Sequence, residues 1–154
     1  MYWIESPRRV IQRVSRAEVR VEGEVVGSIA RGLLVLVGIE KSDDETGVLW
    51  QADKVASLRV FADAGGRMNR ALEDVSGAVL AVSQFTLAGS ILKGRRPGFD
   101  NAMEPSRAEA LFDLFVKRLR SLGVPTETGR FGTMMEVELV NDGPVTFVLE
   151  APSR

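Results

Sequence analysis

The fold is decided by one continuous apolar stretch, Gly32-Leu33-Leu34-Val35-Leu36-Val37-Gly38-Ile39, with glycines at its start and near its end. The stretch contains no polar side chain, which is typical of a β-strand covered on both faces. A membrane-spanning helix would need about 18 apolar residues, far more than are present here. We therefore predict a strand near the centre of a sheet.

Apolar segments on either side of this stretch predict the other strands. Before it, residues 10–21 alternate apolar and polar side chains, and the break at Gly23-Glu24 predicts a hairpin with one solvated face. After it, residues 77–82 form a second buried run that continues into Ser83-Gln84-Phe85-Thr86-Leu87. Two further strand pairs are predicted around turns, residues 58–61 with 67–68 and residues 135–139 with 145–149.

Two segments carry the signals of amphipathic helices. Ser42-Asp43-Asp44-Glu45 is a capping box that precedes apolar residues at helical spacing. Pro105 and a second capping box, Ser106-Arg107-Ala108-Glu109, predict another helix that ends before Gly123. The predicted architecture is a mixed α/β (α+β) single domain of strands and two helices. Residues 1–7 are predicted as an N-terminal extension, and residues 8–154 as the domain.

Charge and missing residue types exclude several classes of function. There are 20 Lys and Arg against 21 Asp and Glu, a net charge of −1, so a polyanion must meet a local basic patch. The chain has no Cys and no His. Disulfides, thiolate nucleophiles, zinc sites built on Cys or His, and Ser-His-Asp relays are therefore excluded. The first nine residues lack the apolar core of a signal peptide, so we expect a cytoplasmic protein with no membrane partner.

A candidate site lies where the second buried strand ends. Ser83, Gln84 and Thr86 place two hydroxyls and an amide there, and strand alternation would point Gln84 and Thr86 away from Phe85. Neighbouring backbone could simply satisfy these groups, as it does for most buried polar groups. Thr86 could instead be a nucleophile, although no His is present to serve as its base.

Two loops carry further candidate residues. Lys93-Gly94-Arg95-Arg96-Pro97 is a cationic loop that could bind phosphates, with an ordinary solvated loop as the alternative. Its position shortly after the polar strand end favours phosphate binding. Asn141-Asp142-Gly143-Pro144-Val145-Thr146 predicts a tight turn between two strands, in which the bond before Pro144 could be cis. A plain structural hairpin is the alternative.

Five segments together resemble the D-aminoacyl-tRNA deacylase family, formerly called D-tyrosyl-tRNA deacylase. They are residues 8–14, 83–87, 93–97, 128–132 and 141–146, and their order and spacing match the family. Ser-Gln-Phe-Thr at residues 83–86 and Asn-x-Gly-Pro-x-Thr at residues 141–146 are its two signatures. The resemblance extends from Arg8 to Glu150. Two departures are residues 1–7 and the stretch Gly89-Ser90-Ile91-Leu92, which is more apolar than in many members.

The resemblance implies a fold, an activity and partners. The fold has two β layers covered by two helices (β/β/α), and the protein is expected to be a homodimer. The activity is hydrolysis of the ester between a D-amino acid, or glycine mischarged on tRNA(Ala), and the terminal adenosine of tRNA. This activity is a form of chiral proofreading in translation. No metal and no cofactor are implied.

The resemblance also implies a pocket made from Ser83, Gln84, Phe85 and Thr86. Backbone N–H groups near Phe85 and Thr86 would stabilise the developing oxyanion. An aminoacyl ester is already activated, and the neighbouring 2′-hydroxyl of the RNA can assist, so a protein without His needs mainly an oxyanion hole and accurate placement.

The remaining implied roles concern substrate recognition. Gly143 and Pro144, joined by a cis bond and held by Arg13, would reach into the pocket of the other subunit and exclude L-amino acids. Phe131 and Met135 would form a wall of the adenine site. The cationic loop with Lys93, Arg95 and Arg96 would contact the phosphates of tRNA.

Two other functions remain open at this point. One is a non-catalytic RNA-binding module that uses the cationic loop, and the other is a threonine-nucleophile esterase that acts through Thr86. A binding module would release no amino acid, whereas the esterase would form a covalent adduct.

Overall fold

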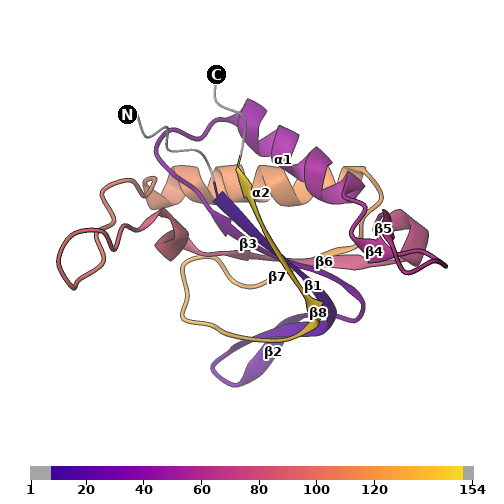
Figure 1. Ribbon diagram of the computed structural model, residues 1–154. Coiled ribbons are helices and arrows are strands. Elements are labelled where there is room, and N and C mark those ends of the chain that lie inside the picture. The colour runs from indigo at the N-terminus through magenta and orange to yellow at the C-terminus, as the bar shows by residue number, and fades with distance from the viewer. Residues whose placement is uncertain (1–7, 151–154) are drawn as a thin grey trace.

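The computed structural model describes residues 8–150, so the predicted extension at residues 1–7 and the end at residues 151–154 lie outside the described part. Figure 1 shows a sheet with two helices along one face. The elements in chain order are β1 (Arg8–Val21), β2 (Glu24–Ile29), β3 (Gly32–Gly38), α1 (Glu45–Ser57), β4 (Phe61–Ala62), β5 (Met68–Arg70), η1 (Glu73–Val75), β6 (Ala78–Ser83), η2 (Phe85–Ala88), α2 (Pro105–Ser121), β7 (Thr126–Thr128) and β8 (Glu136–Glu150).

One six-stranded sheet organises the chain, with strand order β2-β1-β3-β6-β7 and with β8 paired to β1. β1 runs antiparallel to β2, β3 and β8, whereas β3, β6 and β7 are parallel to one another. Each parallel connection contains a helix, as crossovers between parallel strands usually do. The apolar stretch that predicted a central strand is β3, which lies between β1 and β6, so that prediction is confirmed.

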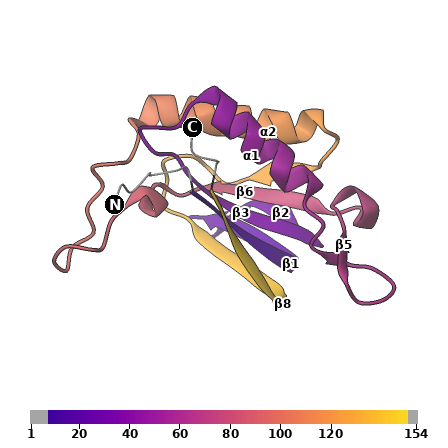
Figure 2. The same ribbon diagram turned by 45° about the horizontal axis from the view of Figure 1, so that its top comes forward.

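The alternation of side chains along β3 creates two cores. Leu33, Val35 and Val37 point into one buried cluster with the apolar residues of α1 and α2. Leu34 points the other way, into a second cluster with Leu80 of β6 and residues of β1 and β2. In Figure 2 both helices lie on one side of the sheet and β8 lies on the other. This arrangement is the β/β/α layering that the resemblance implied.

β1 joins the two β layers because it changes partner along its length. Residues 8–14 pair with β3, and residues 17–21 pair with β2. Gly27 lets β2 pack closely on β7, since a Cβ at this position would stand 2.3 Å from the backbone oxygen of Thr128. Any side chain at residue 27 would therefore push the two layers apart.

Both helices form where predicted, but their N-caps are Asp44 and Glu104 and not the first residues of the predicted capping boxes, Ser42 and Ser106. α1 is capped by Asp44, whose carboxylate accepts a hydrogen bond from the backbone N of Gly47. α2 is capped by Glu104, because Pro105 already fits the first helical position. In the described part of the chain, neither helix is long and apolar enough to cross a membrane.

Two strand predictions need correction, and one strand was missed. Residues 85–88 are the 3₁₀ helix η2 and do not continue β6. Residues 136–150 are one strand that pairs with β1 on both sides of residues 141–146, so the two arms do not form a hairpin with each other. The short strand β7 was not predicted, because three residues with no apolar alternation carry too weak a signal.

Candidate functional site

The first part of the site is the end of β6, next to the end of β3. Ser83 is the last residue of β6 and pairs with Val37 of β3. The backbone N of Gln84 then donates to the backbone oxygen of Val37 at 2.8 Å, which holds the chain as it leaves the sheet. Because Gln84 is extended and η2 begins at Phe85, the chain turns away from the sheet at this point.

This turn places the polar groups on the surface. The amide Nε2 of Gln84 donates to the hydroxyl of Thr86 at 3.1 Å, so these two side chains lie on one side, as strand alternation predicted, although the backbone here is not a strand. Phe85 is 62% exposed. The first backbone hydrogen bond of η2 is donated by Leu87 to the oxygen of Gln84 at 3.2 Å. The N–H groups of Phe85 and Thr86 precede it, and such N–H groups have no partner within their own helix.

The cationic loop follows η2 directly, with its base at Ser90 and Gly98. Ser90 and Gly98 close its base with two backbone hydrogen bonds of 2.7 and 2.8 Å, and the rings of Phe85 and Phe99 are 5.1 Å apart. Residues 91–100 are all exposed, and the loop projects away from the sheet in Figure 1. The structure therefore places Lys93, Arg95 and Arg96 on a projection whose base is packed against the end of β6.

The second part of the site is a bulge in β8. Asn141 pairs with Val14 and Thr146 with Gln12, so four residues of β8 stand opposite the single residue Arg13 of β1. Within this bulge the bond between Gly143 and Pro144 is cis, and Gly143 has φ of +130°, in the region that favours glycine. The bulge replaces the predicted tight turn, because the chain continues along β1 after it.

The side chain of Asn141 spans the bulge from within. Its Oδ1 accepts from the backbone N of Val145 at 3.1 Å, and its Nδ2 donates to the hydroxyl of Thr146 at 3.1 Å. Gln12 of β1 also donates to that hydroxyl, at 3.3 Å. The Asn and Thr of the Asn-x-Gly-Pro-x-Thr signature thus have a structural role in closing the bulge.

Arg13 holds the bulge from the side of β1. Its Nε donates to the backbone oxygen of Asp142 at 3.1 Å and lies 3.2 Å from the carboxylate of the same residue. Its Nη1 donates to the backbone oxygen of Val60 at 2.7 Å. A Cβ on Gly143 would stand 2.7 Å from the Val145 side chain and 3.1 Å from Arg13, so no side chain fits there without a shift.

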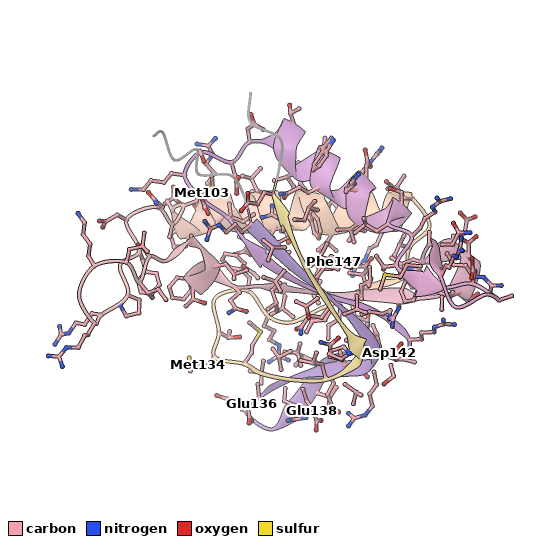
Figure 3. The ribbon with its side chains drawn as sticks, viewed as in Figure 1. Met103, Met134, Glu136, Glu138, Asp142 and Phe147 are labelled. Atoms are coloured by element: carbon pink, nitrogen blue, oxygen red, sulfur yellow. The ribbon has the colours of Figure 1, made fainter. Side chains whose placement is uncertain are left out.

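The bulge and the end of β6 do not meet within one chain. Through the sheet register, Arg13 aligns with Leu33 and Val79, four residues before Val37 and Ser83. At strand spacings, the two parts are separated by roughly 13 Å along the strands and about 14 Å across them. Figure 3 agrees: Asp142 lies at the bend of β8, far from the side on which the cationic loop projects.

Phe131 and Met135 follow β7, but they pack in different layers. Phe131 packs against the helix-side core, with its ring 6.3 Å from Phe112 of α2, and it lines a cavity of about 260 Å³ beside α2. Met135 packs against the core between the β layers and lies under Gly129. Gly129 thus lies next to both residues: it contacts Met135 and lines the same cavity as Phe131.

A buried cluster of charges beside the site was not predicted from the sequence. Arg9 of β1 is fully buried, and Glu40 and Asp43 in the turn after β3 are buried as well. Burial lowers the pKa of Arg9 to about 10 against the attraction of both carboxylates. Burial also raises the pKa of Asp43 to about 6, although the hydrogen bond from Glu40 N and the charge of Arg9 oppose this. The available signal was the alternation of Arg9 with Ile11, which places Arg9 on an inward face.

No group of three or more His, Cys, Asp or Glu side chains within residues 8–150 is arranged so that it could hold a metal ion.

Comparison with known proteins finds the same family along most of the chain. A family model described as D-Tyr-tRNA(Tyr) deacylase matches residues 10–150. The D-aminoacyl-tRNA deacylase of Symbiobacterium thermophilum is 59% identical over 144 residues, which cover 94% of this chain and 95% of that protein. The protein of the same name from Geobacter metallireducens is 57% identical, with 94% and 96% coverage.

Solved structures share the fold. The c-Myc DNA unwinding element binding protein superposes with a TM-score of 0.89 at 40% identity, and the match covers 95% of this chain and 99% of that one. A probable eukaryotic D-amino acid tRNA deacylase gives a TM-score of 0.80 at 18% identity, with 95% and 100% coverage, and supports the fold alone. The family model and the curated relatives show that the chain belongs to the D-Tyr-tRNA(Tyr) deacylase family, a family of hydrolases.

Proposed function

We propose that this protein hydrolyses the ester bond between a D-amino acid, or glycine mischarged on tRNA(Ala), and the terminal adenosine of tRNA. It would do so in the cytoplasm, where tRNA is aminoacylated. The observation that carries the proposal is the division of the two signatures between two surfaces of one chain. The end of β6 offers polar groups and the N–H groups that precede the first hydrogen bond of η2, and the β8 bulge offers a rigid backbone.

The pocket formed by Ser83, Gln84, Phe85 and Thr86 would receive the ester. Attack of water on the ester carbonyl places negative charge on the carbonyl oxygen, and the N–H groups of Phe85 and Thr86 would donate to it. The hydroxyl of Thr86 is hydrogen-bonded to the Gln84 amide, which is not a base, and this contact supports a positioning role over a nucleophilic one. The 2′-hydroxyl of the terminal adenosine would help to place or activate the water.

Chiral selection would come from the bulge of a second copy. Because the bulge and the pocket of one chain lie apart, a complete site needs the bulge of another subunit. The apolar side chains of Val140, Phe147 and Val148 on β8 are exposed, at 41%, 42% and 62%, which supports β8 as the surface where two copies meet. Gly143 and Pro144 would then present backbone oxygens that leave no room for the side chain of an L-amino acid.

The tRNA would lie across the same surface. Lys93, Arg95 and Arg96 would contact its phosphates beside the pocket. The terminal adenine would lie near Gly129, beside Phe131 and Met135. Selection by exclusion implies that the D-amino acid's own side chain matters little to the rate.

Release of tyrosine from D-tyrosyl-tRNA by the purified protein tests this function against its two rivals. We expect free tyrosine and tRNA, with no covalent adduct on the protein by mass spectrometry. Thr86→Ala should keep measurable activity, whereas a substrate with a 2′-deoxy terminal adenosine should lose most of it. A loss of activity in Thr86→Ala together with normal hydrolysis of the deoxy substrate would favour the threonine esterase. Binding without release would favour the RNA-binding module.

The oligomeric state can be tested separately. Sedimentation should show a dimer for the wild type and a monomer for Phe147→Glu/Val148→Glu, and the monomer should lose chiral selectivity. Trp50→Glu on α1 is the matched control, because Trp50 is also an exposed apolar residue, at 37%, but lies on the helix layer. A monomeric variant that still rejects L-tyrosyl-tRNA would overturn the shared site.

A further inference from the structure

Arg9 is a buried arginine in a place where packing alone would favour an apolar residue. It is 0% exposed, and its guanidinium carbon lies 5.7 Å from the ring centre of Phe115 in α2. Its neighbour on the same face of β1, Ile11, is part of the apolar core. A buried charge costs several kcal/mol to desolvate and often stabilises a protein less than an apolar side chain would. Its presence therefore calls for a role other than packing.

The guanidinium is directed at the end of β3. Its Nη1 donates to the backbone oxygen of Gly38 at 2.7 Å and to that of Arg8 at 3.1 Å, whereas Nε and Nη2 have no hydrogen-bond partner within residues 8–150. The buried carboxylates of Glu40 and Asp43 attract its charge from the turn that follows β3. Arg9 is thus held to the end of β3 and to the turn that follows it, through the Gly38 oxygen and through the charges of Glu40 and Asp43.

The opposite side of Gly38 carries the candidate pocket. A Cβ at Gly38 would stand 2.6 Å from the Cβ of Leu87 and 3.3 Å from the backbone oxygen of Gln84, so η2 rests directly on this glycine. The preceding residue, Val37, accepts the hydrogen bond from the backbone N of Gln84. Gly38 is therefore in contact with Arg9 on one side and with the Gln84–Leu87 turn on the other.

Residues 39–41, which follow Gly38, also form hydrogen bonds with residues 101–103, where the chain comes back from the cationic loop. The backbone oxygen of Ile39 accepts from the N of Met103 at 3.2 Å, and the N of Lys41 donates to the oxygen of Asn101 at 2.9 Å. Residues 38–41 thus hold both the start and the end of the segment that carries the pocket and the loop. A shift of Gly38 would therefore move both the Gln84–Leu87 turn and residues 101–103.

We propose that Arg9 is a positioning residue of the deacylation site, which acts through the carbonyl of Gly38 to fix the backbone of residues 84–87. This inference rests on the proposed function and adds a residue outside both signatures. Arg9 does not touch the substrate. It limits the movement of the N–H groups at Phe85 and Thr86, and oxyanion donors are effective only when they are held in place before the reaction.

Single-turnover hydrolysis of D-tyrosyl-tRNA by the wild type, Arg9→Met, Arg9→Lys and Arg8→Met tests this role. Arg9→Met keeps the length of the side chain but removes the donor, so the rate per folded molecule should fall by about 10- to 100-fold, as misplaced catalytic groups do. KM should stay within about threefold, because the substrate contacts are intact. Arg9→Lys should recover part of the rate. Arg8→Met changes an exposed residue paired with Glu150 and should match the wild type.

Urea unfolding of each variant separates positioning from stability. A folded Arg9→Met protein with the wild-type rate would overturn the proposal. If Arg9→Met does not fold, Arg9→Lys decides: it keeps a charge opposite Asp43 and Glu40 but loses the guanidinium geometry, so a wild-type rate in that variant overturns the proposal. A wild type that releases no tyrosine would instead refute the proposed function, which distinguishes the two failures.

Discussion

Arg13 of β1 and Asp142 of β8 are joined at two points: the Nε of Arg13 donates to the backbone oxygen of Asp142 at 3.1 Å and lies 3.2 Å from its carboxylate. Arg13 is also the one residue of β1 that faces the four-residue bulge. The contact therefore joins the strand to the backbone that we propose as the chiral filter.

Arg13→Ala should loosen this filter. The bulge would lose its contact with β1, so we expect hydrolysis of L-tyrosyl-tRNA to rise about tenfold relative to D-tyrosyl-tRNA, equivalent to about 1.4 kcal/mol. Rates for both substrates under single turnover give this ratio. Arg16→Ala is the matched control, because Arg16 lies on the same strand but pairs with Glu138 at the surface. Equal ratios in the two variants would contradict the prediction.

Asn141→Ala should destabilise the fold. It removes the acceptor of Val145 N–H, which belongs to a buried residue, and the donor to Thr146, so a loss of about 1–2 kcal/mol is expected. Asn141→Asp keeps the acceptor, so its free energy of unfolding should fall by less. Urea unfolding measures both, with Asn69→Ala in exposed β5 as a control expected within about 0.5 kcal/mol of the wild type. An Asn141→Ala variant with the wild-type free energy of unfolding would show that the bulge does not need the hydrogen bonds of Asn141.

Neutralising the cationic loop should reduce the salt dependence of tRNA binding. Each arginine that contacts a phosphate releases counterions, so Arg95→Gln/Arg96→Gln should lower the slope of log Kd against log salt by up to about one per residue. Fluorescence titrations over a salt series provide the slopes. Arg67→Gln/Arg70→Gln removes the same charge from the β4–β5 pair and should leave the slope unchanged. If both double variants change the slope equally, the cationic loop does not contact tRNA phosphates more than other surface arginines do.

The buried carboxylate of Asp43 should make stability depend on pH. Its folded pKa is raised to about 6 by burial, above the ordinary value of 3.8. Between these values the folded protein keeps a proton that the unfolded chain releases, so this group's contribution to stability falls as pH rises through that window. Urea unfolding at pH 4.5 and 7.5 should show a decrease that is smaller in Asp43→Asn by about 1–2 kcal/mol. If the free energy of unfolding changed with pH equally in the wild type and in Asp43→Asn, the raised pKa of Asp43 would be contradicted.

The sequence predicted the central strand and the two helices because their signals are local. The apolar run at β3 and the helical spacing in α1 and α2 depend on burial, which the pattern of side chains records. The end of β6 was misjudged because Gln84 and Thr86 look like a strand continuation, and only the contact of Leu87 with Gly38 shows that the chain must turn. The β8 bulge was missed for a similar reason, since a Gly-Pro pair marks a turn and the pairing with β1 is a long-range property.

The residues proposed for the candidate site were named from the resemblance, which did not predict their geometry. The two signatures supplied the residues that we propose for the pocket and the bulge, and the structure shows how Arg13, Asn141 and Thr146 brace the bulge. Arg9 was not predicted, because arginine is mostly an exposed residue type, although its spacing from Ile11 places it on the inward face. Its burial follows from the packing of α2 over β1, which the sequence of β1 does not contain.

The most direct test of the account is the ratio of rates at which the wild-type protein hydrolyses matched D- and L-tyrosyl-tRNA under single turnover. If the backbone of Gly143 and Pro144 excludes L-amino acids, the D substrate should react at least about 100-fold faster, a difference of about 2.7 kcal/mol between transition states. Equal rates for the two substrates, or faster hydrolysis of the L substrate, would contradict the claim that this protein selects its substrate by chirality.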